Sequence, residues 1–148
     1  MTNQTRHYCI LLIEDNPGDV RLTQEAFLET GVDIDLQVVM DGVEAVAYLQ
    51  RQGKYAGRPT PDLILLDLNL PKWGGREVLE KIKNDEELLE IPVVVLTTSN
   101  ASADVLASYG LHANCFINKP VDFDRFFQII NNIQQFWLQT VTLPGSVR

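Results

Sequence analysis

One apolar run limits the fold of this chain more than any other feature. Residues 63–66 read Leu-Ile-Leu-Leu without a polar interruption, and the run ends at Asp67 before Pro71 stops regular structure. A strand without polar alternation is typical of a strand covered on both faces, and such strands occur in parallel sheets. In open sheets of this kind, ligands bind outside the carboxyl ends of the strands. We therefore expect Asp67 to lie at the functional edge of a parallel sheet.

The remaining chain supplies four more strand-like runs that alternate with helical patterns. The expected strands are residues 8–13, 34–39, 63–66, 93–96 and 115–117. The expected helices are residues 17–30, 42–51, 74–84, 101–109 and 122–138, each given to within a residue or two. Alternation of this type, with right-handed crossovers, predicts an α/β fold in which a doubly wound parallel sheet carries helices on both faces. Residues 52–61 are expected to form a solvated loop and residues 139–148 an extended C-terminal tail.

Length and charge narrow the function classes. The 148 residues predict a single domain over residues 1–148 with a core of about 7–138. A net charge of −8 disfavours nucleic acid as a partner, because phosphate binding needs clustered Lys and Arg. No apolar run is long enough to span a membrane, and no basic-then-apolar leader is visible. We expect a cytoplasmic protein with no membrane partner.

Chemically capable side chains follow four of the predicted strands. Glu14 and Asp15 follow the first strand, Asp67 the third, Thr97 the fourth and Lys119 the fifth. Because the carboxyl ends of parallel strands meet at one edge, all five side chains are expected to converge. Three close carboxylates repel one another unless a cation lies among them, and a hard divalent ion, Mg²⁺ or Mn²⁺, meets that need.

This arrangement suits phosphoryl transfer to a carboxylate. We expect Asp67 to be the nucleophile and Asp15 a direct metal ligand, while Glu14 acts through a metal-bound water. The backbone carbonyl of Asn69 is the expected fourth contribution to the metal. Lys119 would supply positive charge to the phosphoryl group, and the Thr97 hydroxyl would donate a hydrogen bond to it.

In this order the motifs resemble the receiver domain of two-component response regulators over residues 7–138. The resemblance is carried by the acidic pair, by Asp67 with Pro71 and Gly75, by Thr97, and by Lys119-Pro120. It implies a flavodoxin-like sheet of strand order 2-1-3-4-5, phosphorylation by a sensor histidine kinase, and little catalysis beyond the chain's own phosphorylation and dephosphorylation. It also implies an aromatic switch residue, here Phe116, that acts with Thr97. The peptide before Pro120 is implied to be cis, which would aim Lys119 at the site.

A finer resemblance is to the small response regulators paired with cyanobacterial phytochromes. It rests on Ile13–Asp19, on the long loop before the third strand, on Leu96–Ser99 and on the ending Phe136–Pro144. It implies a phytochrome-type light sensor as the kinase. Since the chain has no room for a DNA-binding output domain, we expect signalling through altered protein contacts or onward phosphotransfer.

Two other function classes share part of this pattern. Asp-nucleophile phosphatases of the haloacid dehalogenase type use a second carboxylate two residues after the nucleophile, whereas this chain has Asn69, and an amide cannot act as a general acid. A receiver-like interaction module that does not accept phosphate is the other alternative, although no member of the acidic group is missing.

The last predicted helix has an unusually wide apolar face. Phe126, Ile130, Ile133 and Trp137 form one stripe at about 100° per residue. Ile129 and Phe136 then lie on a flank, and exposed apolar area of this kind often marks a contact surface. We expect a homodimer through this flank; the alternative is that the tail of residues 140–144 covers it within one chain.

Overall fold

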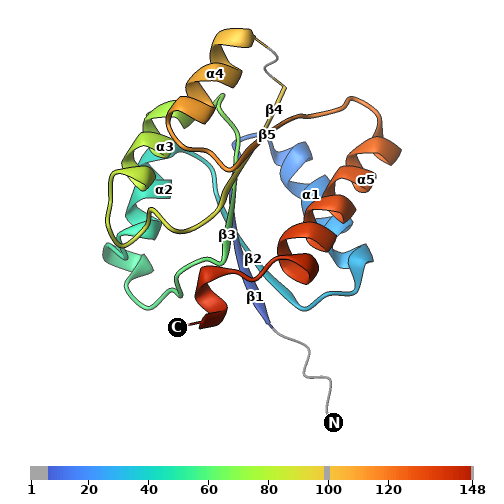
Figure 1. The fold of residues 1–148 in the computed structure, drawn as a ribbon, viewed down its shortest axis with the longest axis horizontal. Coiled ribbons are helices and arrows are strands. Elements are labelled where there is room, and N and C mark those ends of the chain that lie inside the picture. Colours follow the sequence, from blue (N-terminus) through green and yellow to red (C-terminus); the bar gives the residue numbers. More distant parts are fainter. Residues whose placement is uncertain (1–6, 99–100, 148) are drawn as a thin grey trace.

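The computed structural model describes residues 7–98 and 101–147, so Ser99 of the Leu96–Ser99 motif and Arg148 of the tail lie outside the described residues. Five parallel strands form one sheet in the order β2-β1-β3-β4-β5 (Figure 1). The strands are β1 (Tyr8–Ile13), β2 (Ile34–Val39), β3 (Leu63–Leu66), β4 (Val93–Thr97) and β5 (Cys115–Asn118). The helices are α1 (Pro17–Thr30), α2 (Gly42–Leu49), α3 (Gly75–Lys83), α4 (Ser102–Gly110) and α5 (Phe123–Ile133). The predicted fold class and strand order are therefore confirmed.

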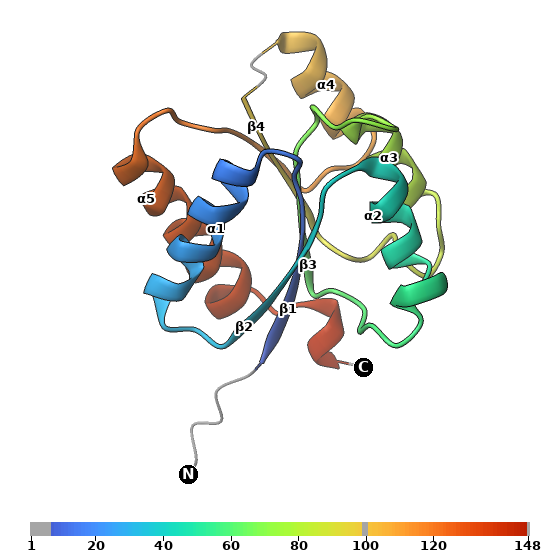
Figure 2. The same ribbon diagram turned by 180° about the vertical axis from the view of Figure 1, so that it is seen from behind.

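Helices cover both faces of the sheet. Helices α1 and α5 lie side by side on one face, and α2, α3 and α4 lie on the other (Figures 1 and 2). Each face has its own apolar cluster: one joins β1, β3 and β4 to α2 and α3, and the other joins the same strands to α1 and α5. All four residues of β3 are fully buried, as an uninterrupted apolar run requires of a central strand.

Local sequence signals set the helix ends. Helix α1 begins with Pro17 in its first turn, and the Asn16 side chain accepts a hydrogen bond from the Asp19 N–H at 3.0 Å. It ends at Gly31, whose φ of 73° is a left-handed conformation that glycine adopts without strain. Asp41 caps α2 by accepting from the Glu44 N–H at 2.7 Å.

The C-terminal region differs from the prediction in two ways. The α-helix ends at Ile133 rather than near residue 138, and the chain continues in wider π-helical turns over Gln134–Thr140. The tail is not extended: Leu143 is only 2% exposed and joins the cluster beneath α1 and α5, and a short 3-10 helix follows over Pro144–Val147. The Tyr8 hydroxyl donates to the Leu138 carbonyl at 2.5 Å, which ties the start of β1 to this region. Burial of an apolar side chain explains why the tail folds back.

The loop over residues 52–61 is mostly exposed, as predicted, but Tyr55 and Pro61 are buried. Tyr55, in a short 3-10 helix over Gly53–Tyr55, is buried with its ring centroid 5.2 Å from that of Tyr48. Its hydroxyl donates to Glu44 at 2.8 Å. Among the described residues, no helix is both long enough and apolar enough to cross a membrane.

Candidate functional site

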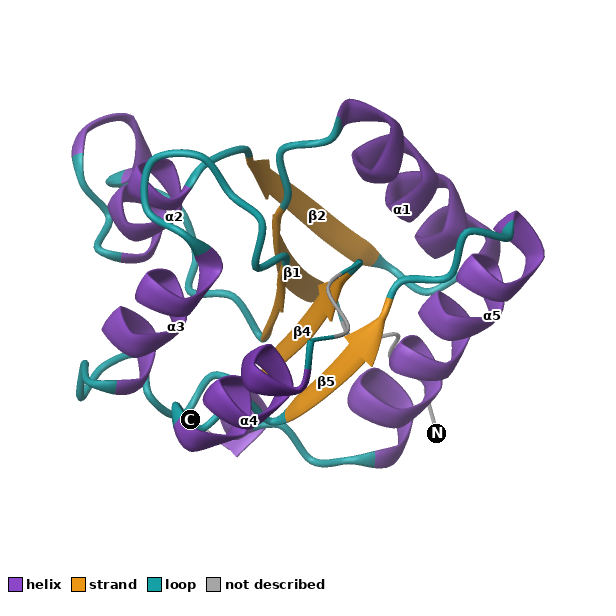
Figure 3. Cartoon of the chain, turned by 90° about the horizontal axis from the view of Figure 1, so that it is seen from above, coloured by secondary structure: helices purple, strands orange, loops and turns teal. Residues whose placement is uncertain are grey.

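Strand register brings the predicted site residues to one edge of the sheet. Ile13 of β1 pairs with Leu66 of β3, so the next residues, Glu14 and Asp67, emerge side by side. Thr97 is the last residue of β4 and pairs with Asn118 of β5, which directly precedes Lys119. Viewed from above, β4 and β5 run in the same direction, with the helices ranged on either side of the sheet (Figure 3). The convergence predicted from the strand ends is confirmed.

Asp67 is buried and fully engaged by hydrogen-bond donors. Its Oδ1 accepts from the Thr97 hydroxyl at 2.7 Å and from the Asn69 N–H at 3.0 Å, and its Oδ2 accepts from Lys119 Nζ at 3.0 Å. Burial by itself would raise the pKa of Asp67, but these hydrogen bonds and the charge of Lys119 hold that pKa below its ordinary value. Asp67 is therefore an ionised carboxylate at neutral pH, as a nucleophile must be.

Lys119 connects three carboxylates. Its ammonium group contacts Glu14, Asp19 Oδ2 at 2.9 Å and Asp67 Oδ2 at 3.0 Å, and its side chain is only 5% exposed. Asp19 was missed as a site residue in the sequence analysis. Its only signal was its place in the first turn of the helix that follows the acidic pair.

The expected cis peptide before Pro120 is wrong for this structure, because no peptide bond in the described residues is cis. Trans is the favoured form of an X-Pro bond in folded proteins. The trans geometry still allows Lys119 Nζ to reach Asp67, so the reach of the lysine does not depend on a cis bond.

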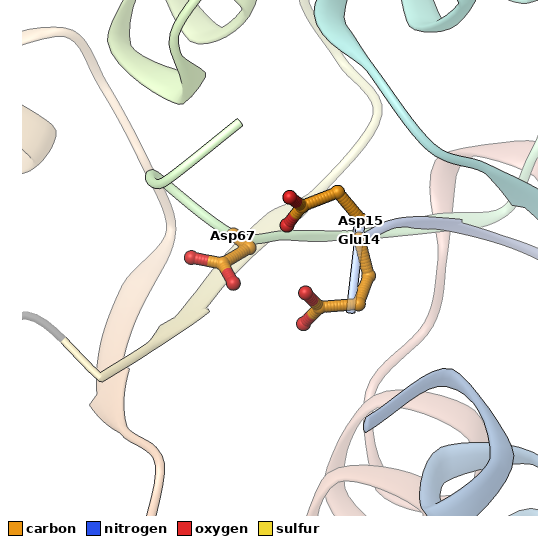
Figure 4. A group of neighbouring side chains, drawn as sticks. All are labelled: Glu14, Asp15 and Asp67. Atoms are coloured by element: carbon orange, nitrogen blue, oxygen red, sulfur yellow. The ribbon is translucent and has the colours of Figure 1, made fainter. Parts of the chain in front are cut away.

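Three carboxylates form a group suited to a metal ion. Glu14, Asp15 and Asp67 each offer an oxygen atom, and these atoms lie within 4.8 Å of one another (Figure 4). Figure 4 shows the carboxylates of Glu14 and Asp15 directed toward the side of Asp67. Oxygen donors of this kind fit Mg²⁺ or Mn²⁺. Burial raises the pKa of Glu14 to about 7 against the opposing effect of Lys119, and a bound cation would favour its ionised form.

The first residue of α3 packs against the backbone of Asp67. A Cβ atom on Gly75 would lie 2.5 Å from the Asp67 carbonyl oxygen and 2.5 Å from Leu68 Cα, so only glycine fits there. The Gly75 N–H donates to the Leu68 carbonyl at 3.0 Å. Asn69 is exposed beside Asp67, and its carbonyl as a metal ligand stays a prediction.

The two expected switch residues differ in burial. Thr97 is fully buried and already bonded to Asp67, whereas Phe116 is partly buried against the apolar cluster shared with α2 and α3. The Phe116 N–H donates to the Tyr109 hydroxyl of α4 at 3.2 Å, a link that the sequence did not indicate. The switch itself stays a prediction.

The predicted dimer residues lie away from the acidic group. Phe136 is 52% exposed and Ile129 is partly buried, and both line a shallow apolar hollow with Cys115, Ile117 and Trp137. Leu143 of the tail is buried in the cluster beneath α1 and α5, but Phe136 stays 52% exposed.

Comparisons with known proteins agree with this geometry. The model of the response regulator receiver domain matches residues 10–131. The chain is 51% identical to response regulator Rcp1 of Synechocystis sp. over 137 residues, which cover 93% of each chain. The crystal structure of the phosphorylated cyanobacterial phytochrome response regulator RcpA matches with a TM-score of 0.91 and 52% identity, covering 94% of this chain and 99% of RcpA. The Mn²⁺-bound form of Rcp1 matches with a TM-score of 0.89 and 51% identity, covering 93% and 99%. The chain therefore belongs to the response regulator receiver family and is a homologue of Rcp1 and RcpA.

Proposed function

We propose that the protein is a cytoplasmic response regulator in which Asp67 accepts a phosphoryl group from the phosphohistidine of a sensor kinase. The observation that supports this most is the convergence of Thr97 and Lys119 on a buried, ionised Asp67 beside two further carboxylates. In the reaction, a carboxylate oxygen of Asp67 attacks phosphorus, the bond between phosphorus and the histidine nitrogen breaks, and the imidazole leaves with the electron pair. The protein's own catalysis is limited to this acceptance and the later hydrolysis.

Each remaining site residue has a defined task in this proposal. Asp15 would bind the divalent ion directly, Glu14 through a water molecule, and Asn69 through its backbone carbonyl. The ion, Mg²⁺ with Mn²⁺ as a substitute, would neutralise phosphoryl oxygens during transfer. Thr97 and Lys119 would then exchange their bonds to Asp67 for bonds to the phosphoryl group.

We propose that the output is a change of surface on the α4, β5 and α5 side. An aspartyl phosphate brings about −1.5 to −2 of charge to a position where Thr97 and Lys119 are already within reach. Rebinding of Thr97 would pull the end of β4, and Phe116 on neighbouring β5 would repack. A partner that binds this side would sense the difference.

The partner proposal follows from the relatives. RcpA is a cyanobacterial phytochrome response regulator, and 94% of this chain aligns with 99% of RcpA. We propose a phytochrome-type light sensor kinase as the phosphodonor here, with one receiver domain over residues 1–148 as the responding unit.

A homodimer through α5 is part of the same proposal. Phe136 is half exposed next to β5, an edge strand of the sheet, and a twofold axis would bury both copies of that apolar flank at once. Ile129 would contribute from α5, which precedes the π-helical turns that carry Phe136.

The test is phosphate incorporation from acetyl phosphate with Mg²⁺. Wild type and a control, Asp33→Asn, which changes an exposed carboxylate on the β1–β2 side, should both take up label. Asp67→Asn should take up none, and uptake at the wild-type level would overturn the assignment. Lack of uptake by wild type would favour the interaction-module alternative. Hydrolysis of many phosphate monoester molecules by each protein molecule would favour the phosphatase alternative.

A further inference from the structure

Lys119 has one carboxylate partner outside the metal group. An ammonium group has three N–H donors, and here its three partners are Glu14, Asp67 and Asp19. Glu14 and Asp67 also belong, with Asp15, to the group that could hold a divalent ion. Asp19 does not, and it reaches Lys119 across a hundred residues of sequence from α1.

A metal ion held by this group would share two carboxylates, Glu14 and Asp67, with Lys119. The Lys119 ammonium lies against Glu14 and Asp67, so a cation bound by these carboxylates would lie close to it, and close like charges repel in a partly buried site. If Lys119 had no other partner, it would leave the site or weaken the ion when the ion bound. A carboxylate outside the metal group gives the Lys119 ammonium a partner that is not also a metal ligand.

Asp19 is held in a defined position. It lies in the first turn of α1, where its N–H donates to the Asn16 side chain at 3.0 Å. Its carbonyl oxygen accepts from the buried Thr23 hydroxyl at 2.7 Å. The Asp19 side chain is 30% exposed, against 5% for that of Lys119, so Asp19 lies on the solvent side of the ammonium group.

We propose that Asp19 is a positioning residue that holds the Lys119 ammonium within the site while Glu14 and Asp67 serve the metal ion. The inference rests on the proposed metal-dependent function. It assigns to this chain a fourth functional carboxylate, which acts through Lys119 and does not bind the ion. Loss of Asp19 would leave Lys119 with only the metal ligands as partners, so the ion would bind less tightly.

The experiment measures Mn²⁺ affinity by calorimetric titration in a double-mutant cycle. Asp19→Asn should weaken Mn²⁺ binding about tenfold in the wild-type background, as expected for an unscreened like charge at the site. In the Lys119→Gln background the same change should alter affinity less than about twofold, because the competing ammonium is gone. Glu25→Gln, which removes the same charge from α1 at an exposed position paired with Arg21, is the matched control and should bind like wild type.

Asn retains the size of the side chain and the backbone hydrogen bonds of residue 19, and thermal melts will check that Asp19→Asn stays folded. Asp19→Glu, which keeps the carboxylate, should recover most of the lost affinity. Equal losses in both lysine backgrounds would mean that Asp19 acts as a plain charge, and unchanged affinity in Asp19→Asn would mean that it has no role; either result overturns the inference. Failure of wild type itself to bind Mn²⁺ would instead overturn the proposed metal dependence, and this inference with it.

Discussion

Gly75→Ala tests how closely the start of α3 must pack against the backbone of Asp67. The added Cβ would lie 2.5 Å from the Asp67 carbonyl oxygen, so backbone must move by about 1 Å to restore normal contact. Overpacking of this kind costs about 1–3 kcal/mol, against a gain below about 1 kcal/mol for alanine in a helix. We expect a net loss of about 1–2 kcal/mol, which lowers Tm by about 2–8 °C.

The same displacement should affect phosphorylation. A shift of about 1 Å at a reacting carboxylate can cost up to about 100-fold in rate, so folded Gly75→Ala should accept phosphate from acetyl phosphate about 10- to 100-fold more slowly. Gly110→Ala is the control, since a Cβ on this last residue of α4 meets no atom within 4 Å. If Gly75→Ala has the same Tm as Gly110→Ala and is phosphorylated at the wild-type rate, the steric reasoning is wrong.

Three further predictions address other parts of the molecule. Because burial raises the folded-state pKa of Glu14 from 4.5 to about 7, its protonation favours the folded state. In the presence of a metal chelator, the free energy of unfolding should therefore fall by about 1–3 kcal/mol between pH 4.5 and pH 7. Denaturant titrations should show this fall for wild type and not for Glu14→Gln. Leu143→Ala should lower the free energy of unfolding by about 2–4 kcal/mol, because the side chain is part of the core. Val147→Ala, at a position 74% exposed, should have the Tm of wild type, and equal Tm values for the two variants would contradict this prediction. Phe136→Asp should convert a dimer to a monomer in sedimentation while phosphorylation of Asp67 persists, and a monomeric wild type, with or without phosphodonor, would refute the dimer.

The sequence by itself determined the central strand and the functional edge. The uninterrupted run before Asp67 is typical of a strand covered on both faces, and β3 is fully buried. Glu14, Thr97 and Lys119 were identified because residues at the carboxyl ends of parallel strands must meet, whatever the details of the helices. These inferences depend on local pattern and on a general property of parallel sheets.

Only the tertiary structure decided which distant groups touch. The partnership of Asp19 with Lys119 joins the first turn of α1 to the residue that follows β5, and the sequence offers several other carboxylates that could have faced the lysine. Burial of Leu143 likewise depends on a core built by α1, α5 and β1, since the tail has no periodicity that would indicate contact.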